Sequence, residues 1–305
     1  MRLSRTARAV LGCVTAAGLA LVHVPLLLVL LNSVNADRSF GWPPSGLTGR
    51  WWRAALHSDG ARQALLTSLW AGLAATAIAL VLGTLAAYAV HRHRFFGRRT
   101  VSFLLVLPIA LPGIVSGIAL NAAFRTVLDP IGVGFGLFTV VVGHATFCVV
   151  IVFNNVGARL RRIAPSLAEA SADLGARPWQ TFRHVTFPAM RSALFAGGLL
   201  AFALSFDEIV VTTFTAGPGT RTLPVWIYEN LARPHQAPVV NVVAALLIVA
   251  SVVPVYIAQR LSSDTAGGTA VRLSRSASGA PRGSRSRCPG TAPAGRCSAT
   301  TPRPG

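Results

Sequence analysis

The sequence contains no lysine and has few charged residues. Only 12% of its 305 residues are charged and 52% are hydrophobic, whereas a soluble domain usually carries about 25% charged residues. The charge is one-sided, because 28 arginines stand against 9 acidic residues. Without lysine the chain cannot build a phosphate-binding loop of the GxxxxGK[ST] type, whose lysine contacts the β- and γ-phosphates. The composition therefore indicates a membrane protein that is not itself a P-loop ATPase.

Cysteine is also scarce, and its spacing excludes two further classes of site. Cys13 and Cys148 lie in apolar stretches, and Cys288 and Cys297 lie near the C-terminus, with no CxxC pair among them. This pattern predicts neither a metal site nor a disulfide framework. We expect no catalytic, cofactor-binding or metal-binding residue in this chain.

Long apolar stretches dominate what remains. A helix needs about 20 apolar residues to cross about 30 Å of hydrocarbon. Five stretches of sufficient length contain no charged residue, and a sixth contains only the pair Asp207 and Glu208. The predicted spans cover residues 9–31, 64–90, 101–124, 130–158, 192–220 and 234–259. The expected fold class is therefore all-α, a polytopic membrane protein with six transmembrane helices.

The distribution of arginine predicts the orientation of these spans. If the N-terminus is cytoplasmic, 21 arginines lie on the cytoplasmic side and 7 lie outside. Both termini are then cytoplasmic. The expected organisation is a cytoplasmic N-terminus (1–8), a membrane domain (9–260) with a cytoplasmic loop (159–191), and a disordered tail rich in Arg, Ser, Pro and Gly (261–305). The alternative of a cleaved signal peptide is disfavoured, since the first apolar run of 23 residues exceeds the usual 7–15, roughly.

Two stretches inside the predicted spans hold unusual residues. Pro108, Pro112 and Gly113 in LPIALPGIVSG predict a bent or locally unwound helix, although Pro and Gly are also common in ordinary membrane helices. Asp207 and Glu208 would each oppose insertion by about 2.5–3.5 kcal/mol at mid-depth. At least one carboxylate could line a transport path and attract a cationic solute, or the pair could cap or bond neighbouring helices. Adjacent helical residues point about 100° apart, so both are not expected to line one path.

A polar insert, EASADLGARPWQTFRHVTFP, separates the fourth and fifth spans. Ser166 and Glu169 fit a capping box at the start of a short helix, and Gly175 stands where a left-handed residue often ends one. Pro178 suits the first turn of a second helix, which we expect to end at Pro188. Considered alone, such an amphipathic loop could simply lie at the membrane surface.

The spacing within the insert is more specific than its composition. It keeps every step of the pattern EAA, three residues, Gly, nine residues, Ile, one residue, Leu-Pro. The residues at these positions are Glu169, Ala170, Ser171, Gly175, Val185, Phe187 and Pro188. This arrangement resembles the EAA loop of bacterial ABC importer permeases, the inner membrane components of binding-protein-dependent transport. Asp173, four residues after Glu169, shares its helical face and adds a second negative charge.

The resemblance implies a type I importer permease fold and a function. The loop would be a coupling helix seated in a separate ATPase subunit, with Glu169 paired to a basic residue there and Gly175 allowing the turn. The partners implied are an ATPase dimer, a second homologous permease subunit, an extracytoplasmic solute-binding protein and the lipid bilayer, but no nucleic acid. ATP would be hydrolysed by the partner, so this multi-pass chain of the bacterial inner membrane would bind no cofactor and would not be an enzyme.

The solute is less strongly indicated than the family. The stretches LPIALPGIVSGIAL and LSFDEIVVTTFTAGPGTRTLPVWIYENL resemble the spermidine/putrescine permease branch most, which implies a polyamine. Relatives that import ferric iron or phosphonates share much of the pattern. An ion-coupled secondary transporter, with Asp207 or Glu208 as a proton site, is disfavoured because the halves lack an evident inverted repeat, and a scaffold without transport would have no use for the loop.

Other polar and aromatic residues favour structural roles. We expect helix–helix hydrogen bonds rather than a site from His144, Asn121, Asn154 and Asn155. Trp226 and Tyr228 could contact the solute or its binding protein, but anchoring at the membrane interface is the simpler interpretation.

Overall fold

The structure is a computed structural model, and it is helical almost throughout. An isolated β-bridge between Asn35 and Leu47 is the only β pairing in the part of the chain that it describes. Met1–Val249 forms one compact unit, and the description below concerns that unit. The predicted tail, residues 261–305, falls outside the described residues. Those residues are 4–37, 44–93, 95–233 and 235–251.

Five helical stretches in the described residues are long and apolar enough to cross a membrane. The sixth predicted span is described only in part, as the shorter apolar helix Ala237–Ser251. The five stretches are α1 (Arg5–Asn32), α3 (Asp59–Arg92), α5 with its following 3-10 turn (Gly113–Ile131), α6 (Leu137–Leu160), and α9 with the turns before it (Pro178–Phe206).

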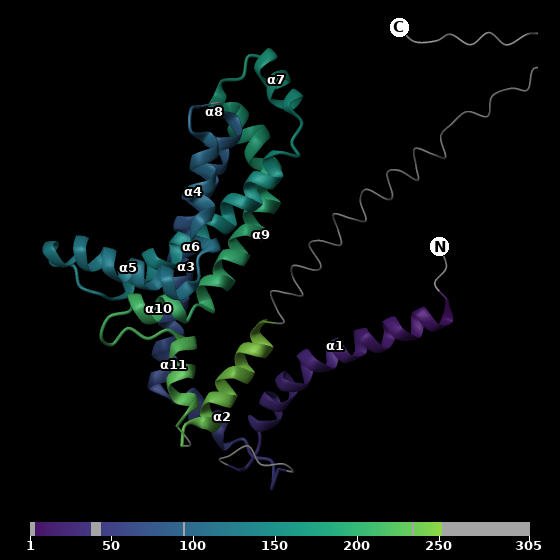
Figure 1. Cartoon of the computed structure of the whole chain (residues 1–305), viewed down its shortest axis with the longest axis vertical. Coiled ribbons are helices and arrows are strands. Elements are labelled where there is room, and N and C mark those ends of the chain that lie inside the picture. Colours follow the sequence, from purple (N-terminus) through teal and green to yellow (C-terminus); the bar gives the residue numbers. More distant parts are fainter. Residues whose placement is uncertain (1–3, 38–43, 94, 234, 252–305) are drawn as a thin grey trace, which may run out of the picture. The chain divides into compact units, whose positions relative to one another are not determined.

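Helices α3, α6 and α9 pack side by side and form the centre of the bundle (Figure 1). Small residues recur every four positions along α3 and allow α6 to approach its backbone closely. The series consists of Ala71, Ala75, Ala79, Gly83 and Ala87, all buried. Three of these alanines, Ala75, Ala79 and Ala87, pack in one core cluster with Val152 and Val156 of α6 and with Ala201 of α9. By contrast, α1 has no buried residue.

We expect Gly83→Leu to destabilise the bundle by about 3 kcal/mol, the upper end of the usual cost of overpacking. A Cβ at Gly83 would lie 2.9 Å from the carbonyl oxygen of Val149 and 2.9 Å from the Cβ of Val152. Thermal unfolding of the purified protein in detergent measures the effect. Gly12→Leu is the matched control, because nothing lies within 4 Å of a Cβ built there; an equal fall in Tm for both variants would contradict the packing argument.

Two of the predicted spans are interrupted: the break in 101–124 lies at the bend predicted from Pro112 and Gly113, whereas the break in 192–220 corrects the expectation of a continuous helix. The span 101–124 is divided into α4 (Arg98–Ala110) and α5 (Gly113–Val127). Pro112 disfavours helical backbone at Leu111, whose ψ is 144°. The span 192–220 is divided into α9 (Phe187–Phe206) and α10 (Val210–Thr215), with residues 207–209 between them.

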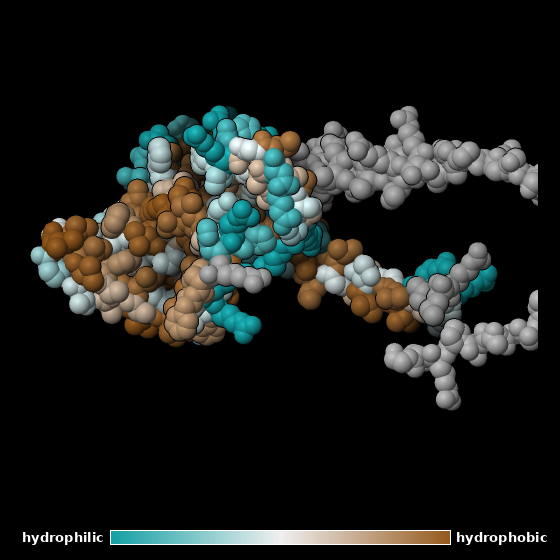
Figure 2. Space-filling model, turned by 90° about the horizontal axis from the view of Figure 1, so that it is seen from above, coloured by the Kyte–Doolittle hydropathy of each residue, from teal (hydrophilic) through white to brown (hydrophobic). Residues whose placement is uncertain are grey.

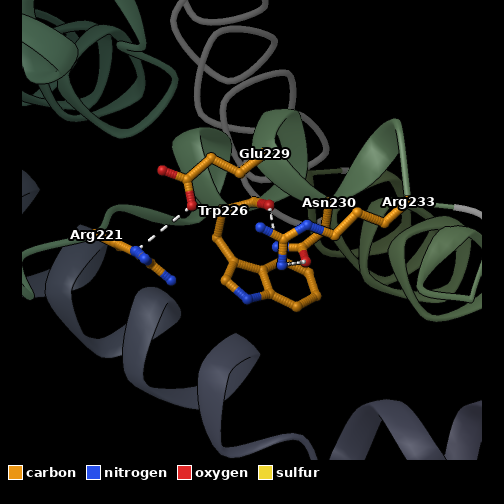
Figure 3. A network of polar contacts seen from close by, with 5 residues as sticks. All are labelled: Arg221, Trp226, Glu229, Asn230 and Arg233. Atoms are coloured by element: carbon orange, nitrogen blue, oxygen red, sulfur yellow. Dashed lines mark hydrogen bonds and ion pairs between the residues drawn. The ribbon is translucent and has the colours of Figure 1, made fainter.

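The end of the bundle opposite α7 is closed by α2 (Arg50–Leu56) and α11 (Leu223–Leu231) (Figure 1). Trp226 of α11 is only 6% exposed and packs among Ala61, Ala64 and Val243. In Figure 3 the Asn230 side chain donates to the Trp226 carbonyl, and Arg233 reaches Asn230. The interpretation of Trp226 as an interface anchor or solute contact is therefore wrong, whereas Tyr228 is exposed.

Candidate functional site

The polar insert forms two short helices at one end of the bundle, α7 (Pro165–Asp173) and α8 (Pro178–Thr181). Gly175 joins them with a φ of +79°, a left-handed conformation that glycine adopts without strain. The Gly175 amide donates to the Ala172 carbonyl at 2.8 Å and the Ala176 amide to the Ser171 carbonyl at 3.1 Å, which is the Schellman arrangement. The prediction of a left-handed turn at Gly175 is confirmed.

Two details of the predicted insert are wrong. The capping box of Ser166 and Glu169 does not form, because Pro165 occupies the first helical position and the N-cap is Ala164, which has no side-chain bond. Pro188 does not end the second helix either. The five residues Phe182–Thr186 form a π-helical turn, and this wider turn leads into α9 past the proline, which lacks an N–H and would crowd the carbonyl four residues earlier.

The outward surface of the insert combines unpaired acids with exposed apolar side chains. Glu169 and Asp173 are exposed and have no ion-pair partner in the described part of the chain. Leu174 is 89% exposed and Trp179 is 66% exposed. Viewed from this end, the molecule shows hydrophilic residues gathered over the tip and hydrophobic residues along the flank (Figure 2). Exposed apolar groups beside free carboxylates are typical of a surface that binds another protein.

The inward side of the insert borders a cavity of about 450 Å³. Ala168, Ala172 and Ala176 line it from the insert, while Tyr88 and Arg92 line it from the end of α3. Three further predicted loop residues, Ser171, Ala170 and Val185, do not line this cavity. Ser171 shares a hydrogen bond of 3.0 Å with Thr181 of α8, Ala170 is exposed and Val185 is half-buried. The α7 helix is therefore held mainly through its connections to α8 and to the π-helical turn.

A second group of predicted residues meets where the two interrupted helices lie side by side. A Cβ on Gly113 would lie 3.6 Å from the Cβ of Val210, and one on Gly117 would lie 2.5 Å from Cδ2 of Phe214. The contacts advance in the same direction along both helices, so α5 and α10 are parallel and their N-terminal ends are neighbours. Pro108 lies inside α4, before this contact.

The far end of α10 is also held by its neighbours. The Asn121 side chain of α5 donates to the Phe214 carbonyl at 2.5 Å, and the Thr139 hydroxyl of α6 donates to the Thr215 carbonyl at 2.7 Å. The predicted helix–helix hydrogen bonding is confirmed for Asn121 and for His144, whose ring bonds side chains of α9 and α10. It is wrong for Asn155, whose side chain bonds the Ile151 carbonyl of its own helix.

The two carboxylates at the break have different surroundings. Glu208 is half-buried, and its Oε1 accepts a hydrogen bond of 2.9 Å from the Val211 amide in the first turn of α10. Asp207 is exposed and has no ion-pair partner among the described residues. The partial positive charge at the neighbouring N-terminal ends of α5 and α10 stabilises negative charge in this region. Glu208 thus has the capping geometry considered from the sequence, and Asp207 keeps a free carboxylate.

The break itself, and the contacts that it creates, were missed from the sequence. Because residues 192–220 were taken as one helix, Ser205 and Thr212 were not considered as partners of His144, which bonds both of them. A signal was available. Five of the six residues in VVTTFT, Val210–Thr215, are β-branched, and such residues have low helix propensity.

The described residues contain no group of three or more His, Cys, Asp or Glu side chains that could hold a metal ion. What they do contain is an apolar helical bundle, a polar insert with exposed carboxylates and apolar side chains at one end, and an exposed carboxylate at the break between α9 and α10. These features are typical of a subunit that spans a membrane and contacts another protein. The chain belongs to the family of binding-protein-dependent transport system inner membrane components, which matches residues 79–265, and it is accordingly a permease subunit of an ABC importer rather than an enzyme.

Individual relatives cover most of the chain. The spermidine/putrescine transport system permease protein PotC of Escherichia coli is 32% identical over 249 residues, which cover 82% of this chain and 92% of PotC. The putrescine transport system permease protein PotI of Escherichia coli is 32% identical over 76% of this chain and 83% of its own length. The putative 2-aminoethylphosphonate transport system permease protein PhnV of Salmonella typhi is 32% identical over 74% of this chain and 86% of its own length.

Two solved structures share the fold. A chain of a bacterial ABC transporter involved in the import of the acidic polysaccharide alginate superposes with a TM-score of 0.61 at 19% identity, over 87% of this chain and 99% of that one. A chain of the MetNI methionine ABC transporter superposes with a TM-score of 0.51 at 21% identity, over 67% and 97% respectively. At these identities the likeness concerns the fold alone. The predicted all-helical class and the predicted family are both confirmed.

Proposed function

We propose that this subunit forms half of the path by which an ATP-driven importer moves a polyamine, such as spermidine or putrescine, into a bacterial cell. The observation that carries the proposal is the exposed carboxylate of Asp207 at the break between α9 and α10. A free carboxylate in surroundings of low dielectric constant attracts an organic cation strongly. The relatives whose names specify spermidine or putrescine support this class of solute.

The coupling to ATP is assigned to the polar insert. In this proposal α7 is seated in a cleft of a separate ATPase subunit, where Glu169 pairs with a basic residue and the exposed side chains of Leu174 and Trp179 are covered. Asp173 adds to the negative surface, and Gly175 sets the angle between α7 and α8. The absence of an ion-pair partner for either acid among the described residues supports a partner of opposite charge. ATP is then bound and hydrolysed by the partner dimer.

The membrane topology follows from the sequence. We assign six spans to residues 9–260, with both termini and the insert 159–191 in the cytoplasm, as in a type I importer permease. Residues 1–8 precede the first span, and the tail 261–305 follows the last. A second, homologous permease subunit completes the path, and an extracytoplasmic binding protein delivers the solute to the α11 end of the bundle.

Other solutes and another class of transporter are less well supported. The relative named for 2-aminoethylphosphonate makes a phosphonate the alternative solute, but its anionic phosphonate group would be repelled by Asp207. Ferric iron is a cation and is compatible with Asp207. An ion-coupled secondary transporter would leave the protein-binding surface of the insert without a purpose.

Uptake assays test the proposal. Cells with and without the gene would be supplied in turn with labelled spermidine, putrescine, ferric iron and 2-aminoethylphosphonate. We expect loss of the gene to abolish the uptake of spermidine or putrescine and to spare the other two. Loss confined to ferric iron or the phosphonate would keep the importer and reject the polyamine, whereas uptake that continues after ATP depletion would reject the importer.

A further inference from the structure

The break at residues 207–209 separates α9 from α10. A continuous helix would have moved as one rigid element, but two helices joined by a non-helical segment can move independently. α9 is continuous with the π-helical turn and α8, so it runs from the polar insert to the break. α6 reaches the other side of the insert through residues 161–164. The two helices that flank the insert, α6 and α9, therefore both extend toward α10. The main chain, however, connects α9 to α10 only through the non-helical residues 207–209.

A buried histidine bridges this gap. His144 of α6 is 1% exposed. Its Nδ1 lies 2.7 Å from the hydroxyl of Ser205 in the last turn of α9, and its Nε2 lies 2.8 Å from the hydroxyl of Thr212 in α10. Both hydroxyl-bearing residues are buried as well. One ring thus joins α6, α9 and α10 at the level of the break.

The hydrogen bonds around the ring also have a direction. The Thr212 hydroxyl donates to the carbonyl of Glu208 at 2.7 Å, so its oxygen accepts from the imidazole. The imidazole then carries a proton on Nε2, and in a neutral ring, with one donor and one acceptor, Nδ1 accepts the Ser205 proton. The chain of donors runs from Ser205 through His144 and Thr212 to the backbone of Glu208, and it ends beside Asp207.

We propose that His144 is a positioning residue of the transport cycle, which fastens α10 and the acidic break to the ends of α6 and α9. Movement of the insert then carries α10 and the Glu208 carboxylate that caps it, instead of being lost at the non-helical segment, while Asp207 moves with α9, to whose Ala203 carbonyl its amide donates at 3.1 Å. This inference rests on the proposed function, because it assumes that the insert is the part that the ATPase moves. A network of satisfied buried hydrogen bonds is suited to this role, since it fixes one geometry among three helices.

Transport per ATP hydrolysed tests the inference. The importer, with its ATPase and binding protein, would be reconstituted in vesicles and supplied with labelled spermidine. We expect His144→Leu to retain assembly and ATP hydrolysis within about twofold, and to lower spermidine transported per ATP by about tenfold, a factor that corresponds to the net contribution of one or two hydrogen bonds. His144→Gln should recover part of the ratio, because its amide supplies one donor and one acceptor.

A matched control exists in α1. Among the described residues, His23 is bonded at Nδ1 only to the Leu19 carbonyl of its own helix, so His23→Leu makes the same chemical change and should leave the ratio unchanged. If His144→Leu fails to assemble, Ser205→Ala removes a single bond and should lower the ratio less. An unchanged ratio in a correctly assembled His144 or Ser205 variant, or transport and hydrolysis falling in parallel, would overturn the inference. Failure of the proposed function would instead appear in the wild-type protein, as an absence of ATP-dependent spermidine uptake.

Discussion

Replacing Glu169 with arginine is expected to abolish uptake by separating the permease from its ATPase. The carboxylate is exposed and without an ion-pair partner in the described part of this chain, so a basic residue of the partner subunit would be its counter-charge. Removal of one member of such a pair at an interface costs about 2–5 kcal/mol, and charge reversal adds repulsion. We expect the amount of ATPase that copurifies with the permease to fall at least about thirtyfold, as 2 kcal/mol implies.

Asp59→Arg is the control for this experiment. Asp59 is also exposed, it begins α3 at the other end of the bundle, and its contact with Arg62 is a weak surface pair at 3.7 Å. The substitution makes the same change in net charge without touching the insert. If the two variants retain equal amounts of ATPase, Glu169 is not part of the contact and the insert is not the coupling element.

Neutralising Asp207 is expected to have the second-largest effect. We predict that Asp207→Asn raises the KM for spermidine uptake about tenfold to a hundredfold, the range that corresponds to about 1.4–2.8 kcal/mol of lost attraction. The carboxylate has no ion-pair partner in the part of the chain that the structure describes, so its loss should not disturb the fold. Initial rates of labelled spermidine uptake over a range of concentrations would measure the effect, with the protein level in the membrane as the reference.

Glu208→Gln provides the comparison within the same segment. The carboxylate of Glu208 accepts a hydrogen bond from the Val211 amide, and the carbonyl oxygen of glutamine can accept it equally. We therefore expect a KM within about threefold of wild type, since only a charge-assisted part of the bond is lost. Equal effects of the two variants, or no effect of either, would contradict the assignment of the path to Asp207.

The features that could be predicted from the sequence are those that short-range chemistry determines. Apolar length identified the helices, because a span needs a minimum number of apolar residues whatever its neighbours are. Gly175 was found because few residues other than glycine adopt a positive φ without strain. The family of the chain was predicted correctly from the spacing of residues along one continuous segment, the polar insert.

The features that could not be predicted depend on neighbours distant in the sequence. The break after Phe206 is stabilised by contacts of α10 with Asn121, Thr139 and His144, which lie more than 60 positions earlier in the chain. Trp226 was assigned to the membrane interface because tryptophan is common there, but α3 and the Ala237–Ser251 helix bury it. Pro188 was expected to stop a helix because the π-helical turn before it has no simple sequence signal.

The contrast between α1 and α3 has a consequence for how such chains diverge. α1 has no buried side chain among the described residues, so no neighbour within the chain restricts the size of its side chains. The buried face of α3, in which a side chain at Gly83 would meet the backbone of α6, accepts almost no enlargement. Random mutation under selection should therefore leave α1 rich in neutral replacements, while this face of α3 drifts slowly.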